Sequence, residues 1–395
     1  MHDAGVPSTF TRTSRRLGRA LKRSVGGAAL AALRARLGGR HPRRVLLFSD
    51  GLAYTSEQQF APLLRHRQQI AARFGLVFVL AGTAAIRDLK AADLKGCHAV
   101  GLKLSFRTPA AEAVALARRL FAVAQEAGAR TLYFDGDDDQ GVQWPAVLDM
   151  ADAYIKKHRL SDPAAYRRGF IGKSNLTDHV ARTFGVAFDS DDTPATAPLD
   201  DGQATRILLG WNIAQDDKIY DLCTDIGAAL PDGPRDIDIL CRASVPPTHW
   251  TFGLRDPAVQ TIKSLNGSWA LHAPTDRVSQ AEYYREMLRA RLTVSPFGFG
   301  ELCWRDFEAI LCGSLLVKPD MSHVETWPDL FVPHETYVPL AWDFSDLGKA
   351  CAPYLDDEAR RAQVASTARE RLLHALSGTA FLDRLETVLG KAGLL

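Results

Sequence analysis

Short apolar runs alternate with segments of helical periodicity from Arg44 to Ile155, and this alternation restricts the fold more than any other feature of the chain. Short apolar runs are typical of strands buried in a sheet, whereas apolar residues three and four positions apart are typical of a helix packed on one. Their alternation predicts a parallel sheet with helices on both faces. The expected strands are 45–49, 76–80, 99–104, 131–134 and 153–155, and the expected helices are 57–74 and 110–127.

The chain length predicts two such domains. With 395 residues it exceeds the size at which one hydrophobic core keeps growing. The stretch FDSDDTPATAPLDDGQ is the expected linker because it offers few apolar residues to bury. The fold class is therefore α/β, with two doubly wound, Rossmann-like domains, the second beginning with a strand at 207–209. The expected parts are a leader (1–43), a first domain (44–186), the linker (187–203), a second domain (204–376) and a C-terminal helix (377–395).

The basic charge of the chain is concentrated in its leader. Residues 1–44 hold 11 Lys and Arg and one acid, whereas the remainder has 37 bases and 45 acids. Basic residues interleaved with apolar ones, followed by Leu30, Leu33 and Leu37, favour a peripheral contact with an anionic membrane face. A block of like charge is also typical of a disordered, solvated tail, and the sequence does not choose between the two.

Composition and cysteine spacing indicate a cytoplasmic protein. The chain is 46% apolar and 24% charged and has no apolar run long enough to span a bilayer. Its six cysteines show no spacing typical of a metal site and are expected to be reduced. The inner face of the cytoplasmic membrane is the expected location if the leader binds lipid. No nucleic acid partner is expected.

A glycine-rich loop in the last third of the chain is the strongest indication of a binding site. The apolar run 292–296 is followed by Gly298 and Gly300, and a helical pattern at 301–312 ends before Gly313. Such glycines let the backbone approach a ligand closely, and the start of the helix offers unpaired N–H groups to an anion. The sequence therefore predicts a site for a diphosphate.

Charged residues on one face of this helix have two interpretations. Arg305 would add a forked cationic contact to phosphate, and Glu308 would accept hydrogen bonds from the paired hydroxyls of a sugar. Alternatively Glu301, Arg305 and Glu308, at positions i, i+4 and i+7, would form only a solvated ladder of ion pairs. The spacing alone does not decide between them.

The run SPFGFGELCWRDFEAILCGSLLVKP, followed by ETWPDLF and HETYVPLAWDFSDL, resembles the carboxy-terminal nucleotide-sugar domain of two-domain GT-B glycosyltransferases. The resemblance is closest to their spore-maturation-type and exostosin-like branches. It implies two domains facing across a cleft, and transfer of a sugar from a nucleotide-sugar donor to a hydroxyl of a saccharide or lipid-linked acceptor. It also implies bacterial surface polysaccharide or glycoconjugate synthesis, with no cofactor and no metal. The matching positions are Gly298, Gly300, Arg305, Glu308, Ala309 and Gly313.

The resemblance also implies a set of donor-binding residues in the second domain. The glycine loop and Arg305 would meet the donor diphosphate, helped by Arg242 or Arg255, and Glu308 would bind the nucleotide ribose. His323 would contact the donor sugar, or only stabilise its own loop. Many retaining members carry another glutamate eight positions earlier, where this chain has Gly300, so a retaining mechanism is in doubt. The full implied set is Gly298, Gly300, Glu301, Arg305, Glu308, Arg242, Arg255 and His323.

Carboxylates stand where two of the expected strands of the first domain end. An inverting reaction would need a base there, and the candidates are Asp50, Asp135 and Asp137, with Asp138 beside them. Alternatively, Asp135 and Asp137 would hold Mg²⁺ or Mn²⁺ against a diphosphate, as the Asp-x-Asp motif does in the GT-A fold. The basic patch that follows, at 156–173, would face an anionic acceptor or lie in solvent.

Two common nucleotide motifs are missing. No GxGxxG follows the first strand, so a dinucleotide site is not expected, and GKS at 172–174 lacks the earlier glycine of a P-loop. ATP hydrolysis is therefore not expected. A non-enzymatic sugar-nucleotide or polysaccharide-binding protein of the same fold is the remaining alternative.

Overall fold

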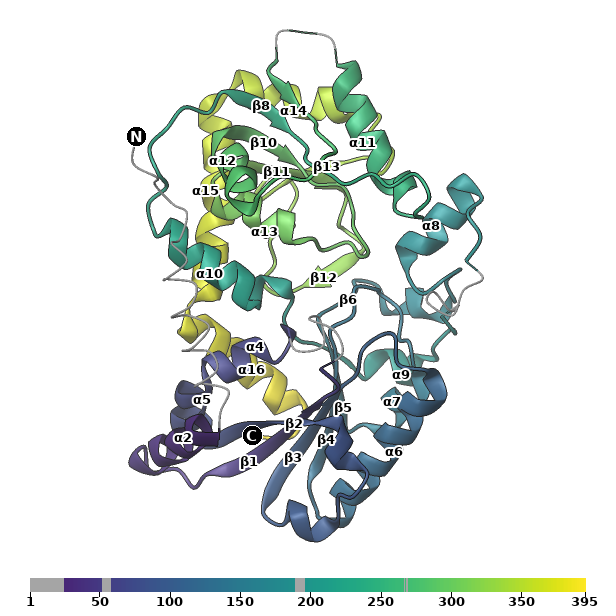
Figure 1. The fold of residues 1–395 in the computed structure, drawn as a ribbon, viewed down its shortest axis with the longest axis vertical. Coiled ribbons are helices and arrows are strands. Elements are labelled where there is room, and N and C mark those ends of the chain that lie inside the picture. The colour runs from purple at the N-terminus through teal and green to yellow at the C-terminus, as the bar shows by residue number, and fades with distance from the viewer. Residues whose placement is uncertain (1–24, 52–57, 189–195, 266, 268) are drawn as a thin grey trace.

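The structure is a computed structural model that describes residues 25–51, 58–188, 196–265, 267 and 269–395. The leader before residue 25 and part of the expected linker lie outside the described residues. The described chain forms two parallel sheets flanked by helices, one below the other in Figure 1. This arrangement confirms the predicted α/β class with two doubly wound domains, which we call the first and second domains in chain order.

The first domain is built on a six-stranded parallel sheet with the order β2-β1-β3-β4-β5-β7. Successive strands are thus added on both sides of β1. The strands alternate with helices because each parallel connection must cross a face of the sheet. The strands are β1 (Arg43–Ser49), β2 (Leu76–Gly82), β3 (Cys97–Lys103), β4 (Arg130–Asp135), β5 (Ala153–Lys156) and β7 (Ile207–Leu209).

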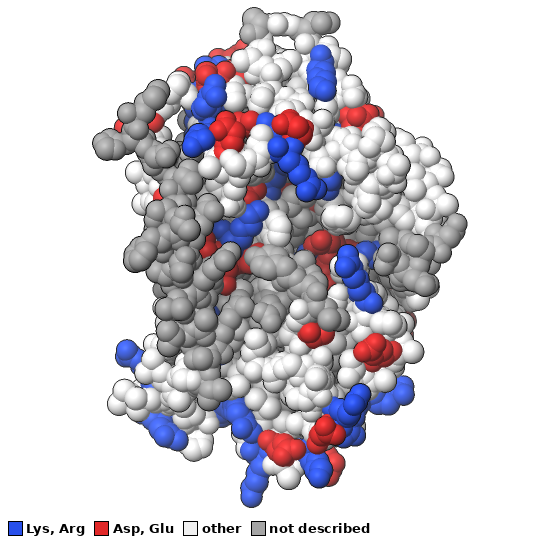
Figure 2. All heavy atoms as spheres, in the orientation of Figure 1, with Lys and Arg blue, Asp and Glu red and all other residues white. Residues whose placement is uncertain are grey.

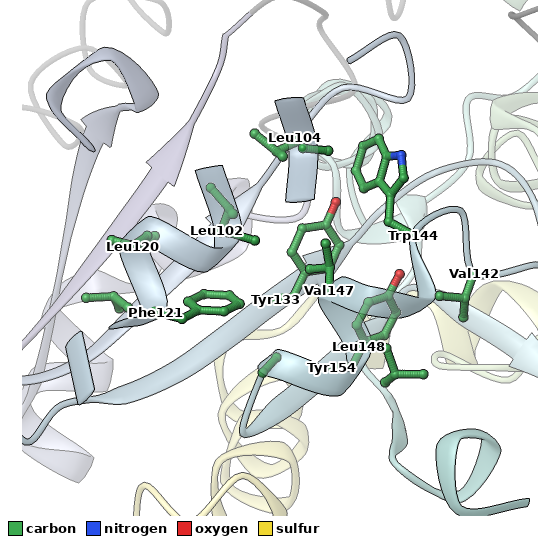
Figure 3. Close-up of a cluster of buried hydrophobic side chains, with 14 of the residues drawn as sticks. Leu102, Leu104, Leu120, Phe121, Tyr133, Val142, Trp144, Val147, Leu148 and Tyr154 are labelled. Carbon is green, nitrogen blue, oxygen red and sulfur yellow. The ribbon is translucent and has the colours of Figure 1, made fainter. Parts of the chain in front are cut away.

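Helices cover both faces of the first sheet. One face packs against α6 (Ala110–Glu126), α7 (Pro145–Met150) and α9 (Asp201–Thr205). Figure 3 shows this core, where the aromatic rings of Tyr133 and Tyr154 stack between α6 and α7. The other face packs against α4 (Ala61–Arg65), α5 (Arg67–Phe74) and α16 (Gly378–Lys391), and α2 (Val25–Leu37) lies on α5 and β2. Short 3-10 helices lie at Thr83–Ile86, Ala91–Leu94, Pro163–Arg167 and Ile213–Gln215.

The second domain is built on a five-stranded parallel sheet with the order β13-β11-β10-β8-β9. Its strands are β8 (Ile237–Leu240), β9 (Leu271–His272), β10 (Ala290–Val294), β11 (Leu315–Pro319) and β13 (Val338–Leu340). Its helices are α10 (Asp217–Ile226), α11 (Phe252–Ser264), α12 (Gln280–Arg289), α13 (Trp304–Leu311), α14 (Leu347–Asp356) and α15 (Glu358–Leu376).

Both sheets share one feature that locates ligand sites. In each, the first strand lies between the second and the third. The loops that follow the first and third strands, β1 and β3 in one sheet and β8 and β10 in the other, therefore leave toward opposite sides. Loops that diverge in this way leave a crevice at the carboxyl ends of the two central strands, and ligands of such sheets bind there. In the second domain this crevice lies between the ends of β8 and β10.

The structure corrects the predicted start of the second domain. The strand expected to open it, 207–209, is β7, which pairs with β5 in the first sheet, Leu208 opposite Ile155. The chain turns away at Gly210, where a Cβ would lie 2.7 Å from a methyl group of Ile155. The crossing to the second domain therefore follows residue 210, and the end of the expected linker forms α9 instead.

Two further segments join the domains. The strands β6 (His158–Leu160) and β12 (Val324–Thr326) pair antiparallel between the sheets. Helix α8 (Asn175–Phe184), expected in the first domain, buries Leu176 and Val180 in the core of the second. The β6–β12 pair and helix α8 thus hold the domains together in addition to the crossing of the chain after residue 210.

The C-terminal helix α16 returns to the first domain (Figure 1). Phe381 of α16 is fully buried and lies 5.3 Å from the ring of Trp211 and 5.4 Å from that of His66. Arg384 donates hydrogen bonds to the carbonyls of Leu209 and Gly210, at the end of β7. Helix α16 is therefore part of the first domain's core. Among the described residues, no helix is long and apolar enough to cross a membrane.

We expect Phe381→Ala to destabilise the protein by about 3–5 kcal/mol because it leaves a cavity between α16 and the sheet. Chemical denaturation measures this change. The matched control is Thr387→Ala, an exposed position of the same helix, which should change stability by no more than about 0.5 kcal/mol. Equal effects would show that α16 does not complete the core.

Candidate functional site

A cavity of about 650 Å³ opens between the domains at the carboxyl ends of β8 and β10. The second domain supplies most of its wall, from the loop after β8, the glycine loop after β10 and the first turns of α12 and α13. The first domain supplies Gln58 and Asp138. This position is the crevice expected from the strand order.

The lining of the cavity is basic. Five basic and three acidic residues face it, a formal excess of two positive charges. Charged side chains of both signs surround the hollow between the two halves of the molecule in Figure 2. An anionic ligand is therefore favoured. The charged lining residues are Lys218, Arg242, Arg255, Arg277, Arg305, Asp138, Asp276 and Glu308.

The glycine loop leads into α13, whose start is three residues later than the sequence predicts. The N–H of Gly298 donates to the carbonyl of Gly300 at 3.0 Å, which closes the loop on itself. The Asp306 carboxylate accepts the N–H of Cys303 at 2.9 Å and lies 3.2 Å from Lys318 Nζ. One of the N–H groups expected to bind an anion is therefore satisfied within the chain.

Gly300 has a different role from the one expected. A Cβ at this position would overlap the carbonyl oxygen of Asp138 in the first domain. The backbone φ of Gly300 is not in the left-handed region, so the requirement for glycine here is steric. The glycine permits the two domains to touch, and Gly298 is the glycine that faces the cavity.

Glu301 and His323 lie behind the loop, not in the cavity. The Glu301 side chain is fully buried, and its Oε1 lies 3.3 Å from His323 Nε2. Neither residue lines the cavity. The structure thus favours the loop-stabilising interpretation of His323. It also contradicts the ion-pair ladder, because Glu308 pairs with Lys218 and Arg305 has no ion pair with a described residue.

The structure distinguishes the two arginines between which the sequence could not choose. Arg242 is held by both carboxylate oxygens of Glu286, each at 2.6 Å, and by Asp276 at 3.1 Å. Arg255 instead donates to the carbonyls of Phe297 and Ser244, and has no carboxylate partner among the described residues. Burial without such a partner lowers the pKa of Arg255. Its uncompensated charge is available to an anion.

Arg305 is the second uncompensated cation. Its guanidinium makes only long contacts, 3.5 Å to Ser295 Oγ and 3.4 Å to the carbonyl of Pro296. Its buried Nε has no hydrogen-bond partner among the described atoms. A buried donor without a partner is costly, and a bound phosphate oxygen would remove that cost. Arg255 and Arg305 thus flank the glycine loop.

Glu308 is enclosed by partners that the sequence did not indicate. Its Oε1 lies 2.7 Å from Lys218 Nζ and accepts from Tyr284 OH at 3.2 Å, and its Oε2 accepts from Tyr283 OH at 3.1 Å. Burial and the nearby carboxylate raise the pKa of Tyr283 well above its usual value, so this hydroxyl remains a donor. A sugar hydroxyl would have to share or replace one of these donors. No motif in the sequence pointed to these two tyrosines, which reach Glu308 from the neighbouring helix α12.

The aspartates at the end of β4 are paired with buried lysines. Asp135 lies 2.8 Å from Lys156 Nζ, and Asp137 lies 2.8 Å from Lys103 Nζ. Burial alone would raise the pKa of Asp137, but Lys103 and other lysines outweigh it and lower that pKa. The next acid in the run differs, because burial raises the pKa of Asp139 to about 6.

This pairing contradicts the predicted exposure of two lysines and bears on the expected roles of two aspartates. Lys156 and Lys157 of the expected surface patch are fully buried and neutralise aspartates. Asp135 and Asp137 are buried and do not line the cavity, so they do not fit the role of base or of metal ligand in it. No group of three or more metal-ligating side chains is found in the described part of the chain.

Asp138 is the aspartate of this run that faces the cavity. Its carboxylate pairs with Lys157 at 2.5 Å and is about one-third exposed. Asp50, the remaining candidate base, accepts the N–H of Ser105 at the switch point of the first sheet and does not line the cavity. Of the four candidate aspartates, Asp138 is thus the one that lines the cavity.

A family comparison matches about one third of the chain, which includes part of the cavity wall. Residues 258–386 match the model of a family described as glycosyl transferase-like. The matched segment includes the glycine loop, Arg305 and Glu308, and it confirms the glycosyltransferase-like character predicted for this region. The narrower resemblance to spore-maturation-type and exostosin-like enzymes stays a prediction. No curated protein matches the sequence significantly.

The solved structures that the chain resembles include one glycosyltransferase and two proteins crystallised with UDP. Anabaena Alr3699/HepE, crystallised with UDP, has a TM-score of 0.47 and 8% identity over 88% of this chain and 99% of that one. A glycosyltransferase from Rickettsia africae ESF-5 has a TM-score of 0.47 and 9% identity over 89% and 98%. S. aureus TarM has a TM-score of 0.38 and 13% identity over 68% and 52%. At such values no substrate or residue role is carried over to this chain.

We expect Gly300→Ala to lower the free energy of unfolding by about 1–3 kcal/mol, because the added methyl group must push the two domains apart. Chemical denaturation and small-angle scattering measure the loss of stability and the wider cleft. The matched control is Gly298→Ala, whose Cβ would meet Cys303 Sγ of the same domain at 3.0 Å. A wider cleft in both variants, or in neither, would contradict the interdomain role of Gly300.

Proposed function

We propose that the protein is a glycosyltransferase that moves a sugar from a nucleotide-sugar donor to a hydroxyl acceptor without a metal ion. The observation that carries this proposal is the pair of uncompensated cations, Arg255 and Arg305, beside the glycine loop of a cavity that two domains share. The match of residues 258–386, which include the glycine loop and Arg305, to a glycosyl transferase-like model supports it. A diphosphate is the ligand whose charge and oxygen atoms suit two guanidinium groups.

In the proposed reaction the second domain binds the donor. Arg255, Arg305 and the backbone at Gly298 stabilise the charge that develops on the departing nucleoside diphosphate. Glu308 accepts hydrogen bonds from the nucleotide ribose, with Lys218 displaced or shared. Because the cations are fixed before the donor arrives, the site needs little rearrangement to stabilise the leaving group.

The first domain then supplies the acceptor side of the cavity. We propose Asp138 as the base that takes the proton of the acceptor hydroxyl, since it is the carboxylate of this domain that faces the cavity. This assignment corresponds to an inverting reaction.

The class of acceptor rests on the resemblance of the sequence to GT-B glycosyltransferases, and no cavity residue is used to identify it. We propose a saccharide or lipid-linked acceptor in bacterial surface polysaccharide or glycoconjugate synthesis, at a cytoplasmic location. All six cysteines are free, which is consistent with a reducing compartment.

We expect one nucleotide among UDP, GDP, CMP, dTDP and ADP to raise the melting temperature equally with Mg²⁺ and with chelator. At a hundred times its Kd it should add about 2.7 kcal/mol of stability. Arg255→Met and Arg305→Met should each weaken this nucleotide by about tenfold to a hundredfold, the range of a charge-assisted hydrogen bond. Arg242→Met is the matched control and should weaken it less, because Glu286 already holds Arg242.

A shift that requires Mg²⁺ would contradict the metal-free site, and no shift with any nucleotide would contradict the donor site. Release of free sugar from the matching donor by the pure protein separates an enzyme from a binding protein of the same fold.

We expect Asp138→Asn to slow sugar transfer by about 10²–10⁴-fold, the usual contribution of a general base, with little change in nucleotide affinity. Steady-state kinetics with a simple acceptor and a nucleotide titration measure the two effects. Asp50→Asn provides the comparison because Asp50 lies outside the cavity. A larger rate loss in the Asp50 variant would assign the base to Asp50 instead.

A further inference from the structure

Helix α2 has one face buried in the protein and the opposite face exposed. Ala31 and Ala35 are fully buried against Ala71 of α5 and Val77 of β2. On the other side Leu30, Leu33 and Leu37 are 44%, 49% and 74% exposed. At 100° per residue the three leucines fall within about 60° of one another and nearly opposite the alanines.

Basic side chains flank this leucine stripe on both sides. On the same helical projection Arg34 lies about 70° to one side of the leucines and Arg36 about 90° to the other. Both are exposed, and no ion pair of either is found within the described residues. Residues 25–49 contain five arginines and no acid. On the face shown in Figure 2, the region over α2 at the lower left carries Lys and Arg but no Asp or Glu.

Contiguous exposed leucines on a helix are unusual in a soluble monomer and mark an interaction surface. An apolar stripe flanked by basic residues is typical of a helix that lies in the interface of an anionic bilayer. There the leucines enter the acyl boundary and the arginines reach the phosphates of the headgroups. We propose that the outer face of α2 binds an anionic lipid surface.

Two other occupants are less compatible with the charges. A second copy docked leucine to leucine would bring the arginines of both helices together, with no acid in residues 25–49 to pair with them. Residues 1–24, which precede α2, hold six bases and one acid, so they would be repelled from Arg34 and Arg36. The same charge would instead add to the attraction of an anionic membrane.

The test is co-sedimentation of the full-length protein with vesicles of phosphatidylcholine, alone or with an equal share of phosphatidylglycerol. We expect binding to the anionic vesicles only, weakened by salt. The variant Leu30→Ser, Leu33→Ser, Leu37→Ser should lose this binding by on the order of tenfold or more. Its fold should remain intact because these side chains face outward, and its melting temperature checks this.

Two further variants test whether vesicle binding depends on the outer face of α2 and not on any exposed apolar side chain. Phe184→Ser removes a similarly exposed apolar side chain from α8 and should leave vesicle binding unchanged. Arg34→Gln with Arg36→Gln should weaken binding to anionic vesicles and reduce its salt dependence.

Equal vesicle binding by the leucine variant would overturn the proposal, because the affinity would then lie elsewhere in the chain. Equal binding to both vesicle types would overturn the anionic specificity. A dimer in analytical ultracentrifugation that dissociates in the leucine variant, with no vesicle binding, would assign the face to a second copy. These outcomes do not depend on the nucleotide titrations, so this proposal and the proposed reaction fail separately.

Discussion

The contact between the backbone of Gly300 and the carbonyl of Asp138 is the constraint on which the cavity depends. It joins the loop after β10 of one sheet to the loop after β4 of the other, so the donor and acceptor walls are set by one point of approach. Any side chain at residue 300 would separate them. The loop that carries Asp138 must in turn be rigid, and the lysine pairs of Asp135 and Asp137 provide this.

These buried pairs are better explained as positioning than as stabilisation. Removing two charges from water costs about as much as their attraction returns, so a buried pair contributes little net stability. The pairs do fix the geometry, because a shift of the loop would leave a buried charge without its partner. The first domain thus uses its aspartates to build one wall of the cavity, and Asp138 is the member of the run that this arrangement leaves exposed to it.

Much of the fold could be predicted from the sequence because period and length identify buried strands and helices locally. Which of the two sheets a strand joins depends on residues far away in the sequence. The apolar run 207–209 gives no indication that its partner is β5 of the first sheet. The glycine loop, Arg305 and Glu308 were candidates from their spacing and from the family resemblance, and the structure places Gly298, Arg305 and Glu308 at the cavity. Spacing could not show that Arg242 is already neutralised by Glu286, from a helix more than 40 residues away.

The prediction of a basic surface patch at 156–173 was wrong for Lys156 and Lys157 for a related reason, whereas Arg167 and Arg168 are exposed. A run of lysines in sequence is usually solvated, but β5 runs through the middle of the domain and ends beside the aspartates of β4. The neutralising partner of Lys156 comes from a strand 21 residues earlier, and pairing of this kind can be known only once strand neighbours are known.

The return of α16 to the first sheet has a consequence for how the chain folds during synthesis. The face of the sheet that α16 covers is apolar, and residues 378–391 are synthesised after the elements of the second domain. Until then the first domain, although synthesised first, has an open core. Domains usually fold as units in the order of synthesis, but here the order is inverted, since the second domain is complete before the first can close. The nascent first domain must therefore be shielded from aggregation while about half of the chain is still being made.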